Sequence, residues 1–223
     1  RYAPTESLAL YMYQSPKKAK KLYFDVIPKQ MDEYLTYQEK YHKAENDEAR
    51  VNNPLWHIHQ QKVPASEKHG LNFSLLLNLA SVCNPESKEV MWGFIRHYSP
   101  NITPENSPLL DRMVDYAIRY YYDFVAPNKN YRAPTQEESK LLEKLIEHLR
   151  KLPNIATSEE VQQSLYDFGR EENITDLRSF FQSMYEILLG QTQGPRFGTF
   201  IALFGLEDTA KRIEQVLHGN KLN

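Results

Sequence analysis

Helical periodicity is the feature that most constrains the fold of this chain. Apolar residues recur at helical spacing along most of the sequence, and no segment alternates between apolar and polar residues strongly enough to predict a strand. The strongest pattern follows Ser107-Pro108 and extends to about Val125, with an apolar face made of Leu110, Met113, Val114, Ala117, Ile118 and Tyr121. We therefore predict an all-α protein, a multi-helix bundle whose helices differ in length.

Start and stop signals divide this pattern into separate helices. Thr135 with Glu138, and Thr157 with Glu160, have the spacing of a capping box, in which two side chains satisfy free backbone N–H groups. Ser15-Pro16 has the order of an N-cap followed by a first-turn proline. Further helices are expected at 5–14, 17–24, 28–43, 71–83, 86–98, 175–189 and 206–218.

Two segments interrupt the helices. The 44–70 segment is long for a structureless loop, so we expect it to be ordered and held by Trp56 and Ile58. The 126–134 segment contains two Pro and two Asn, a composition typical of a linker. We place a domain boundary there, which gives a helical region 1–133 and a second helical region 134–223.

Composition limits the environment and the partners. The single Cys83 excludes an internal disulfide, and a reducing cytoplasm is therefore expected. No apolar stretch is long enough to span a membrane, and there is no secretory signal. The net charge of -2 gives no general attraction to polyanions, so binding to nucleic acid would require local basic patches. The chain begins at Arg1, almost directly in a helical pattern, and we expect it to be part of a longer protein.

The 186–205 stretch is predicted to form a helix, a tight loop and a second helix. Gly190 stands where a left-handed helix cap belongs, and Pro195 is suited to the first position of the next helix. The loop would carry polar and aromatic groups on a rigid mount, a suitable arrangement for binding a flexible ligand. These groups are Gln191, Gln193, Arg196 and Phe197. Alternatively, Gly and Pro serve only the geometry of a helical corner.

Motifs for catalysis are missing from these residues. No phosphate-binding Gly loop and no nucleophile elbow is present. His57, His59 and His69, with Glu67 nearby, could hold zinc in a hydrolase, although packing or hydrogen bonding beside Trp56 explains them as well. Asp111 and Asp115 lie one helical turn apart, which describes either a carboxylate pair or an ordinary solvated face.

Basic side chains gather in three places along the chain. Lys and Arg bind phosphate, and exposed rings stack on unpaired bases, so these groups are candidates for RNA contact. They could equally be solvated faces of a helical protein-interaction module with no nucleic-acid role. The candidates are Lys17, Lys18, Lys20, Lys21, Lys129, Arg132, Lys211 and Arg212.

An ordered set of strings resembles the C-terminal part of class I lysyl-tRNA synthetases of bacterial type. The strings occupy 1–14, 19–25, 53–59, 88–94, 116–121 and 189–198, so the resemblance covers nearly the whole chain. The 204–214 segment is also similar to the end of glutamyl-tRNA synthetases, whose helical region binds the anticodon.

This resemblance implies a parent enzyme that attaches lysine to tRNA(Lys) using ATP with Mg. The family's catalytic signatures, of His-Ile-Gly-His and Lys-Met-Ser-Lys-Ser type, are absent from these residues. The fragment is therefore expected to contain no catalytic residue, no metal and no cofactor, and to bind neither DNA nor a membrane. By resemblance, residues to about 133 form a helical connecting region that contacts the tRNA stem, and the rest forms an α-helical cage for the anticodon.

The chemistry of the loop agrees with this assignment. A uracil edge has two carbonyl acceptors and one imino donor, so Arg can donate to it and Gln can both donate and accept. We therefore expect base contact from Gln191, Gln193, Arg196 and Phe197. The Lys17–Lys21 cluster and the other basic residues would bind the tRNA backbone without reading sequence.

Overall fold

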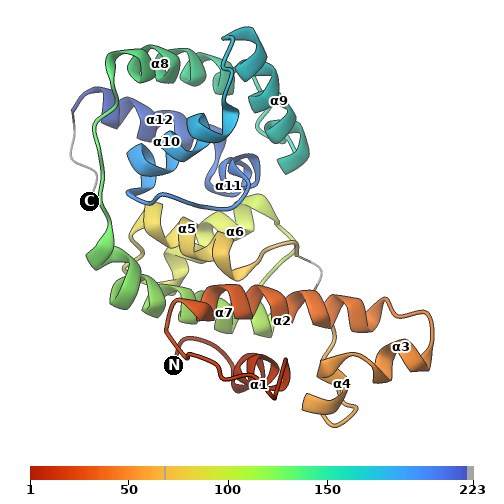
Figure 1. Ribbon diagram of the computed structural model, residues 1–223. Helices are drawn as coiled ribbons and strands as arrows, with labels where there is room; N and C mark the ends of the chain where they lie inside the picture. Colours follow the sequence, from red (N-terminus) through yellow and green to blue (C-terminus); the bar gives the residue numbers. More distant parts are fainter. Residues whose placement is uncertain (68, 220–223) are drawn as a thin grey trace.

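A computed structural model describes residues 1–67 and 69–219 (Figure 1). In the described residues, all regular structure is helical and no strand occurs, which confirms the all-α prediction. The first seven helices are α1 (Thr5–Tyr13), α2 (Val26–His42), α3 (Asp47–Val51), α4 (Pro54–Ile58), α5 (Phe73–Cys83), α6 (Lys88–Tyr98) and α7 (Pro108–Tyr120). The other five are α8 (Gln136–Arg150), α9 (Ser158–Glu171), α10 (Leu177–Leu189), α11 (Phe197–Phe204) and α12 (Leu206–Leu217).

The helices form two halves joined by a central pair. Helices α1, α2 and α7 lie in the lower part of Figure 1, α8 to α12 lie in the upper part, and α5 and α6 lie between them. Helix α7 continues through a π-helical turn, Tyr121–Val125, and a short 3-10 turn, Ala126–Asn128. From there an extended strap, residues 129–135, leads to α8 along one side of the molecule (Figure 1).

One hydrophobic core runs through both halves. Helix α5 packs against α2 and α7 of the lower half and against α10 and α11 of the upper half. Its central residues, including Leu76, Leu79 and Ala80, are fully buried. Between α6 and α11, the rings of Phe94 and Phe204 stack with centroids 5.3 Å apart. The strap therefore connects two halves that already share a continuous apolar interior.

The capping signals of the upper half are confirmed. Both predicted boxes form: the Thr135 N–H donates to Glu138 Oε2 at 2.8 Å, and Thr157 and Glu160 repeat the arrangement. Gly190 ends α10 in the left-handed conformation, with φ of 67°. Helix α11, however, begins at Phe197 with Arg196 as its N-cap, so Pro195 precedes the helix instead of opening it.

The expectation of a helix over 17–24 is wrong. Helix α1 ends at Tyr13, and residues 14–25 are irregular. The Lys20 ammonium donates to the carbonyls of Tyr11 and Gln14, and its Nζ lies 4.7 Å from the centroid of the Tyr11 ring. Ser15 has a φ of 50°, which makes a left-handed turn in place of a helix N-cap. Lys20 thus satisfies the free carbonyls at the end of α1 and turns the chain away from it.

The 44–70 segment contains two short helices, α3 and α4. Of the two expected anchors, Ile58 packs against the core, but Leu55 and Asn53 are more deeply buried than either. Leu55 is fully buried, whereas Trp56 and Ile58 are only half-buried. Asn53 caps α4 through the Leu55 N–H and donates from Nδ2 to the Tyr37 carbonyl at 2.9 Å. An apolar contact and a buried amide, in place of the larger indole, hold this segment against α2.

Candidate nucleic-acid interface

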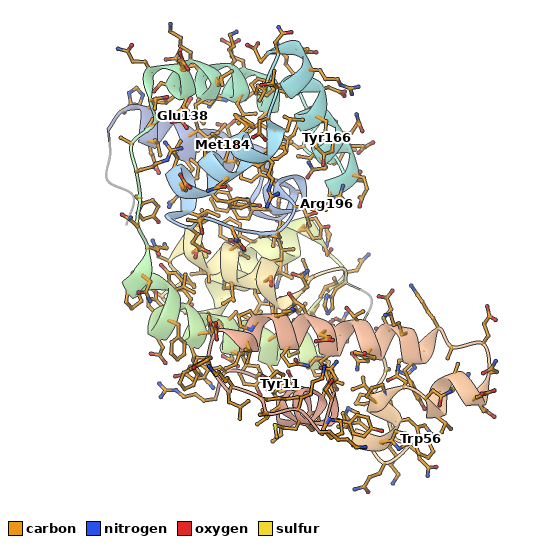
Figure 2. All side chains as sticks on the ribbon, viewed as in Figure 1. Tyr11, Trp56, Glu138, Tyr166, Met184 and Arg196 are labelled. Atoms are coloured by element: carbon orange, nitrogen blue, oxygen red, sulfur yellow. The ribbon has the colours of Figure 1, made fainter. Side chains whose placement is uncertain are left out.

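A cavity of about 820 Å³ opens between α9, α10 and the loop that precedes α11. We call this cavity the cup and define it by the residues that give it chemical character: Tyr166, Arg178, Phe181, Gln182, Gln193 and Arg196. Figure 2 shows Tyr166 and Arg196 on the same side of the upper half. The cup thus combines two aromatic rings, two guanidinium groups and two amides from three separate segments.

The aromatic wall of the cup comes from α9 and α10. Tyr166 is 39% exposed, and its ring centroid lies 6.2 Å from that of the half-buried Phe181. Phe197 supports this wall from behind, because it is only 2% exposed and packs against Phe181 and Tyr185. This differs from the expectation that Phe197 faces RNA, since an apolar ring at the start of α11 is worth more in the core than in water.

The loop of the cup is pinned at several points by close approach. The Tyr185 hydroxyl donates to the Pro195 carbonyl, and a Cβ on Gly194 would lie 2.2 Å from the Tyr185 ring. The Gly198 N–H donates to Gln162 Oε1 at 3.0 Å. These contacts fix the loop backbone while leaving the Gln193 and Arg196 side chains exposed at the rim.

The charges of the cup are mixed. Arg178 and Arg196 are both exposed cations. Hydrogen bonds from Ser179 lower the pKa of Asp176, and the nearby Arg178 contributes further to the lowering. The pKa of Glu159 is lowered in the same way, first by Ser158 and then, among smaller causes, by Arg196. The carboxylates of Asp176 and Glu159 are therefore close enough to interact with these two cations and to moderate the positive charge of the cup.

Gln191 occupies a different position from Gln193. Its Nε2 donates to Ser81 Oγ at 2.6 Å, across the boundary between the halves. The amide is half-buried and its donor is already engaged with protein. The sequence-based expectation grouped Gln191 with the base contacts, whereas its geometry is that of an internal tie.

The first basic cluster divides into bound and free lysines. Lys20 is engaged at the end of α1, but Lys17, Lys18 and Lys21 are exposed on the irregular segment that follows. No described carboxylate forms an ion pair with these three side chains. They remain available to an external polyanion.

The other basic candidates are mostly engaged with protein. Arg132 forms ion pairs with Glu138 and Glu186, each at 2.7 Å, and these hydrogen bonds raise its pKa. Lys129 donates to the Ser81 carbonyl at 2.6 Å, and Arg212 donates to the Leu188 carbonyl at 3.2 Å. These three differ from the expectation of tRNA contact, since their donors are engaged with protein. Arg132 ties the strap to α8 and α10, Lys129 bonds to α5, and Arg212 bonds to both α5 and α10. Lys211 is exposed, 3.9 Å from Asp208.

The histidines and the acid pair have structural partners. His57 bonds to the Val51 carbonyl at 2.9 Å, and His59 bonds to the Tyr34 hydroxyl at 2.9 Å. Among the residues described, no group of three or more His, Cys, Asp or Glu side chains could hold a metal ion. Lys88 pairs with both Asp111 and Asp115, at 2.7 and 2.8 Å. Within the described residues, the zinc hydrolase alternative therefore lacks a ligand set, and the two carboxylates are both engaged with Lys88.

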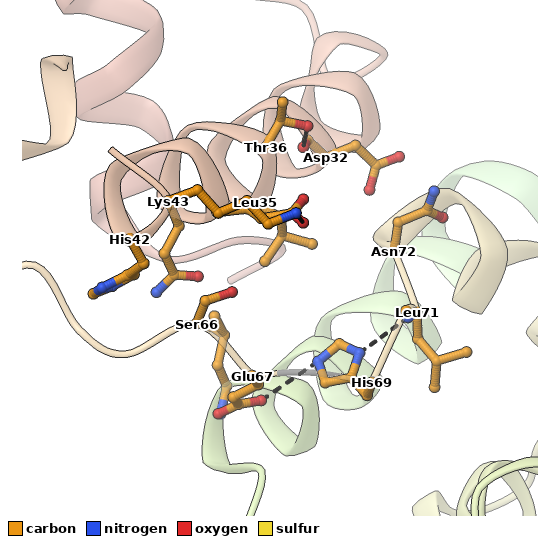
Figure 3. Close-up of a pocket in the computed structure, with 14 residues that line it drawn as sticks. Asp32, Leu35, Thr36, His42, Lys43, Ser66, Glu67, His69, Leu71 and Asn72 are labelled. Carbon is orange, nitrogen blue, oxygen red and sulfur yellow. Dashed lines mark hydrogen bonds and ion pairs between the residues drawn. The ribbon is translucent and has the colours of Figure 1, made fainter. Parts of the chain in front are cut away.

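His69 lines a separate cavity of about 670 Å³ beside α2 (Figure 3). Its Nε2 lies 3.6 Å from Glu67 Oε2, and its Nδ1 accepts from the Leu71 N–H. Glu67 also accepts from the N–H groups of Leu109 and Leu110, which are at the start of α7. These bonds cap α7 and stabilise the carboxylate, so the pair has a structural role.

In the part of the chain that the structure describes, no helix is both long enough and apolar enough to cross a membrane.

Comparison with known proteins identifies the family. The family described as "tRNA synthetases class I (K)" matches residues 1–62, and the "Anticodon binding domain" family matches residues 103–217, which include the whole cup. The lysine–tRNA ligase of Rickettsia bellii is 49% identical over 97% of this chain, and that of Rickettsia felis is 47% identical over 98%. The chain spans 42% of the length of each of these relatives. The chain therefore belongs to the anticodon-binding domain family, as part of a class I synthetase of the lysine–tRNA ligase type.

Proposed function

We propose that the cup reads the anticodon of tRNA(Lys), and that this chain is the anticodon-recognising part of an enzyme that attaches lysine to that tRNA in the cytoplasm. The observation that carries the proposal is the cup itself, where a pinned loop presents Gln193 and Arg196 beside one exposed and one half-buried aromatic ring. An anticodon consists of unpaired bases, which proteins bind by stacking and by hydrogen bonds to base edges.

Each kind of contact has a candidate in the cup. Tyr166 and Phe181 offer ring faces for stacking. Both were missed in the sequence because they lie within helices and outside the loop itself. Arg196 and Arg178 can donate to the carbonyls of a uracil, and Gln193 can donate and accept. In this proposal Phe197 supports the wall and Gln191 ties the loop, so neither touches RNA.

The phosphate contacts are proposed at a distance from the cup. Lys17, Lys18 and Lys21 belong to the segment between α1 and α2, whereas Lys211 belongs to α12. Helices α1 and α2 lie in the lower half and α12 lies in the upper half (Figure 1). Such contacts add affinity that depends on salt and carry no base information. We propose that the region 1–133 contacts the tRNA stem and that 134–223 surrounds the anticodon. Residues 220–223 of the latter range lie outside the described residues.

Lysine, ATP and Mg enter this proposal only through the rest of the enzyme. The described residues offer no cluster of metal ligands, and the sequence contains no phosphate-binding Gly loop. Activation of lysine is therefore assigned to the portion of the synthetase that this chain does not include.

The test compares two tRNAs on the full-length enzyme across a salt series. Gln193→Ala combined with Arg196→Ala should weaken binding of the cognate tRNA by roughly 1–3 kcal/mol per lost contact, with less effect on a tRNA whose anticodon has been changed. Arg170→Ala is a matched control, because Arg170 is an exposed cation on α9 that pairs with Asp167 outside the cup.

Two outcomes would count against the proposal. If the double variant weakened binding of both tRNAs equally, the loop would be a backbone contact and would not read bases. If the wild type bound neither tRNA at any salt concentration, the helical interaction-module alternative would gain support.

A further inference from the structure

The carboxyl ends of α5 and α10 meet where the strap crosses between the two halves. Backbone carbonyls at the end of a helix lack intrahelical partners and carry partial negative charge. Two cations, Lys129 and Arg212, serve these ends. Lys129 donates to the Ser81 carbonyl of α5, and Arg212 donates to the carbonyls of Val82 and Leu188.

Backbone carbonyls and aromatic rings, instead of carboxylates, surround these two cations. Among the described residues, no carboxylate forms an ion pair with Lys129 or Arg212. The Lys129 ammonium lies 4.9 Å from the ring centroid of Tyr121 and 5.4 Å from that of Tyr131. Burial, and then the charge of Arg212, lower the pKa of Lys129 to about 8. The connection between the halves therefore includes partly desolvated cations as well as apolar contacts.

The base-reading loop begins at this same connection. The Asn130 N–H donates to the Gly190 carbonyl at 2.9 Å, and Gln191 Nε2 donates to Ser81 Oγ at 2.6 Å. A Cβ on Gly190 would lie 3.1 Å from the Asn130 nitrogen, so the strap passes closely over the end of α10. The two residues that open the loop are therefore fixed to the strap and to α5, and Gln193 lies two residues after Gln191.

We propose that Ser81 and Gln191 are positioning residues for anticodon recognition: the Ser81–Gln191 hydrogen bond sets where the loop presents Gln193 and Arg196, without either residue contacting RNA. This inference rests on the proposed function of the cup. Ser81 is fully buried and cannot contact RNA, so its effect on recognition must pass through Gln191 or through helix α5, to which Ser81 belongs.

Helix α5 extends this coupling to the lower half. At its amino end, the Asp32 carboxylate of α2 accepts from the Phe73 N–H at 2.6 Å and from the Ser74 hydroxyl at 2.5 Å. Eleven residues of helix make a rigid spacer of roughly 16 Å between α2 and the loop. Helix α5, with a polar tie at each end, thus contributes to the position of the cup relative to the lower half, alongside the packing of α6 against α11.

The experiment measures discrimination, the ratio of the Kd for a tRNA with a changed anticodon to the Kd for the cognate tRNA, in the full-length enzyme. Ser81→Ala removes only the buried hydroxyl, and Gln191→Met removes the amide while keeping its length. Each should lower the ratio about two- to tenfold, the range for one net hydrogen bond. Gln191→Glu should retain most of the ratio, because the Ser81 hydroxyl can then donate to the carboxylate.

The double variant tests whether Ser81 and Gln191 act together through their hydrogen bond or independently. If the two residues act as one tie, Ser81→Ala with Gln191→Met should lose no more than either single variant. If Ser81→Ala leaves the ratio unchanged while Gln191→Met lowers it, Gln191 contacts the base directly and the inference is overturned. A wild type with no discrimination would instead refute the proposed function of the cup. Thermal unfolding of each variant checks that a lowered ratio does not reflect loss of folding.

Discussion

Helices α9 and α11 approach each other closely at Gly198, so replacing this glycine with alanine should destabilise the protein, the opposite of the usual effect within a helix. Replacing a helical Gly with Ala normally stabilises a helix by up to about 1 kcal/mol. At Gly198, however, a Cβ would lie 2.6 Å from the Cα, the Cβ and the backbone nitrogen of Gln162. Ordinary carbon–carbon contact is about 3.5–4.0 Å, so the two helices would have to separate by roughly 1 Å.

The net effect follows from these two opposing terms. Overpacking costs about 1–3 kcal/mol, and a backbone obstacle belongs at the upper end of that range because it cannot rotate away. After the gain in helix propensity, we expect Gly198→Ala to lower the free energy of unfolding by about 2 kcal/mol. For a chain of this size, this corresponds to a fall in Tm of about 4–8 °C.

The matched control is Gly93→Ala. Gly93 is an exposed residue of α6, and a Cβ added to it would have no other atom within 4 Å apart from its own helix backbone and chain neighbours. This variant should be as stable as the wild type or more stable, by up to about 1 kcal/mol. Both are measured by urea unfolding followed by circular dichroism. A Gly198→Ala protein as stable as the wild type would refute the argument that close approach of α9 selects glycine here.

Two further predictions concern the lysines. Lys17→Met should leave the fold unchanged and reduce by about 1 the slope of log K for tRNA binding against log salt concentration. Lys20→Met should instead increase hydrogen exchange in the 14–25 segment, because Lys20 holds that segment to α1. Equal exchange in the two variants would contradict the role given to Lys20. Lys129 has a pKa of about 8 in the folded protein and an ordinary value of 10.5, so the unfolded chain binds more protons between these values. The free energy of unfolding of the wild type should therefore rise from pH 8 to pH 10 relative to that of Lys129→Met. The rise should be less than about 1.4 kcal/mol per pH unit, because water screens part of the charge. If denaturant titrations show the same difference between the two proteins at both pH values, the ammonium is not buried.

Local signals in the sequence predicted much of the fold. The capping boxes at Thr135 and Thr157 and the left-handed cap at Gly190 depend on residues within a few positions of each other, so they can be read without knowledge of the tertiary structure. The error at 17–24 has a different origin. Ser15-Pro16 has the composition of a helix start, but the side chain of Lys20 folds back onto α1 and competes with helix formation.

The candidate site was predicted only in part, because its residues come from separate helices. Gln193 and Arg196 were found from the loop, and both are exposed in the cup. Tyr166 and Arg178 belong to α9 and α10, and their helical patterns contain no sign that they converge on the loop. Lys129 and Arg212 are polar in sequence but half-buried at helix ends, a situation that only the packing of α5 against α10 creates.

The continuous core has a consequence for any attempt to divide the chain at the strap. A nick near residues 131–134 would cut an extended connection but leave α5 and α6 packed against α11, so the two pieces should stay associated and migrate as one particle until denatured. Producing either piece alone would instead uncover the stacked rings of Phe94 or Phe204 and invite aggregation. The strap thus supplies only the covalent link between α7 and α8, while the stacked rings and α5 keep the halves together.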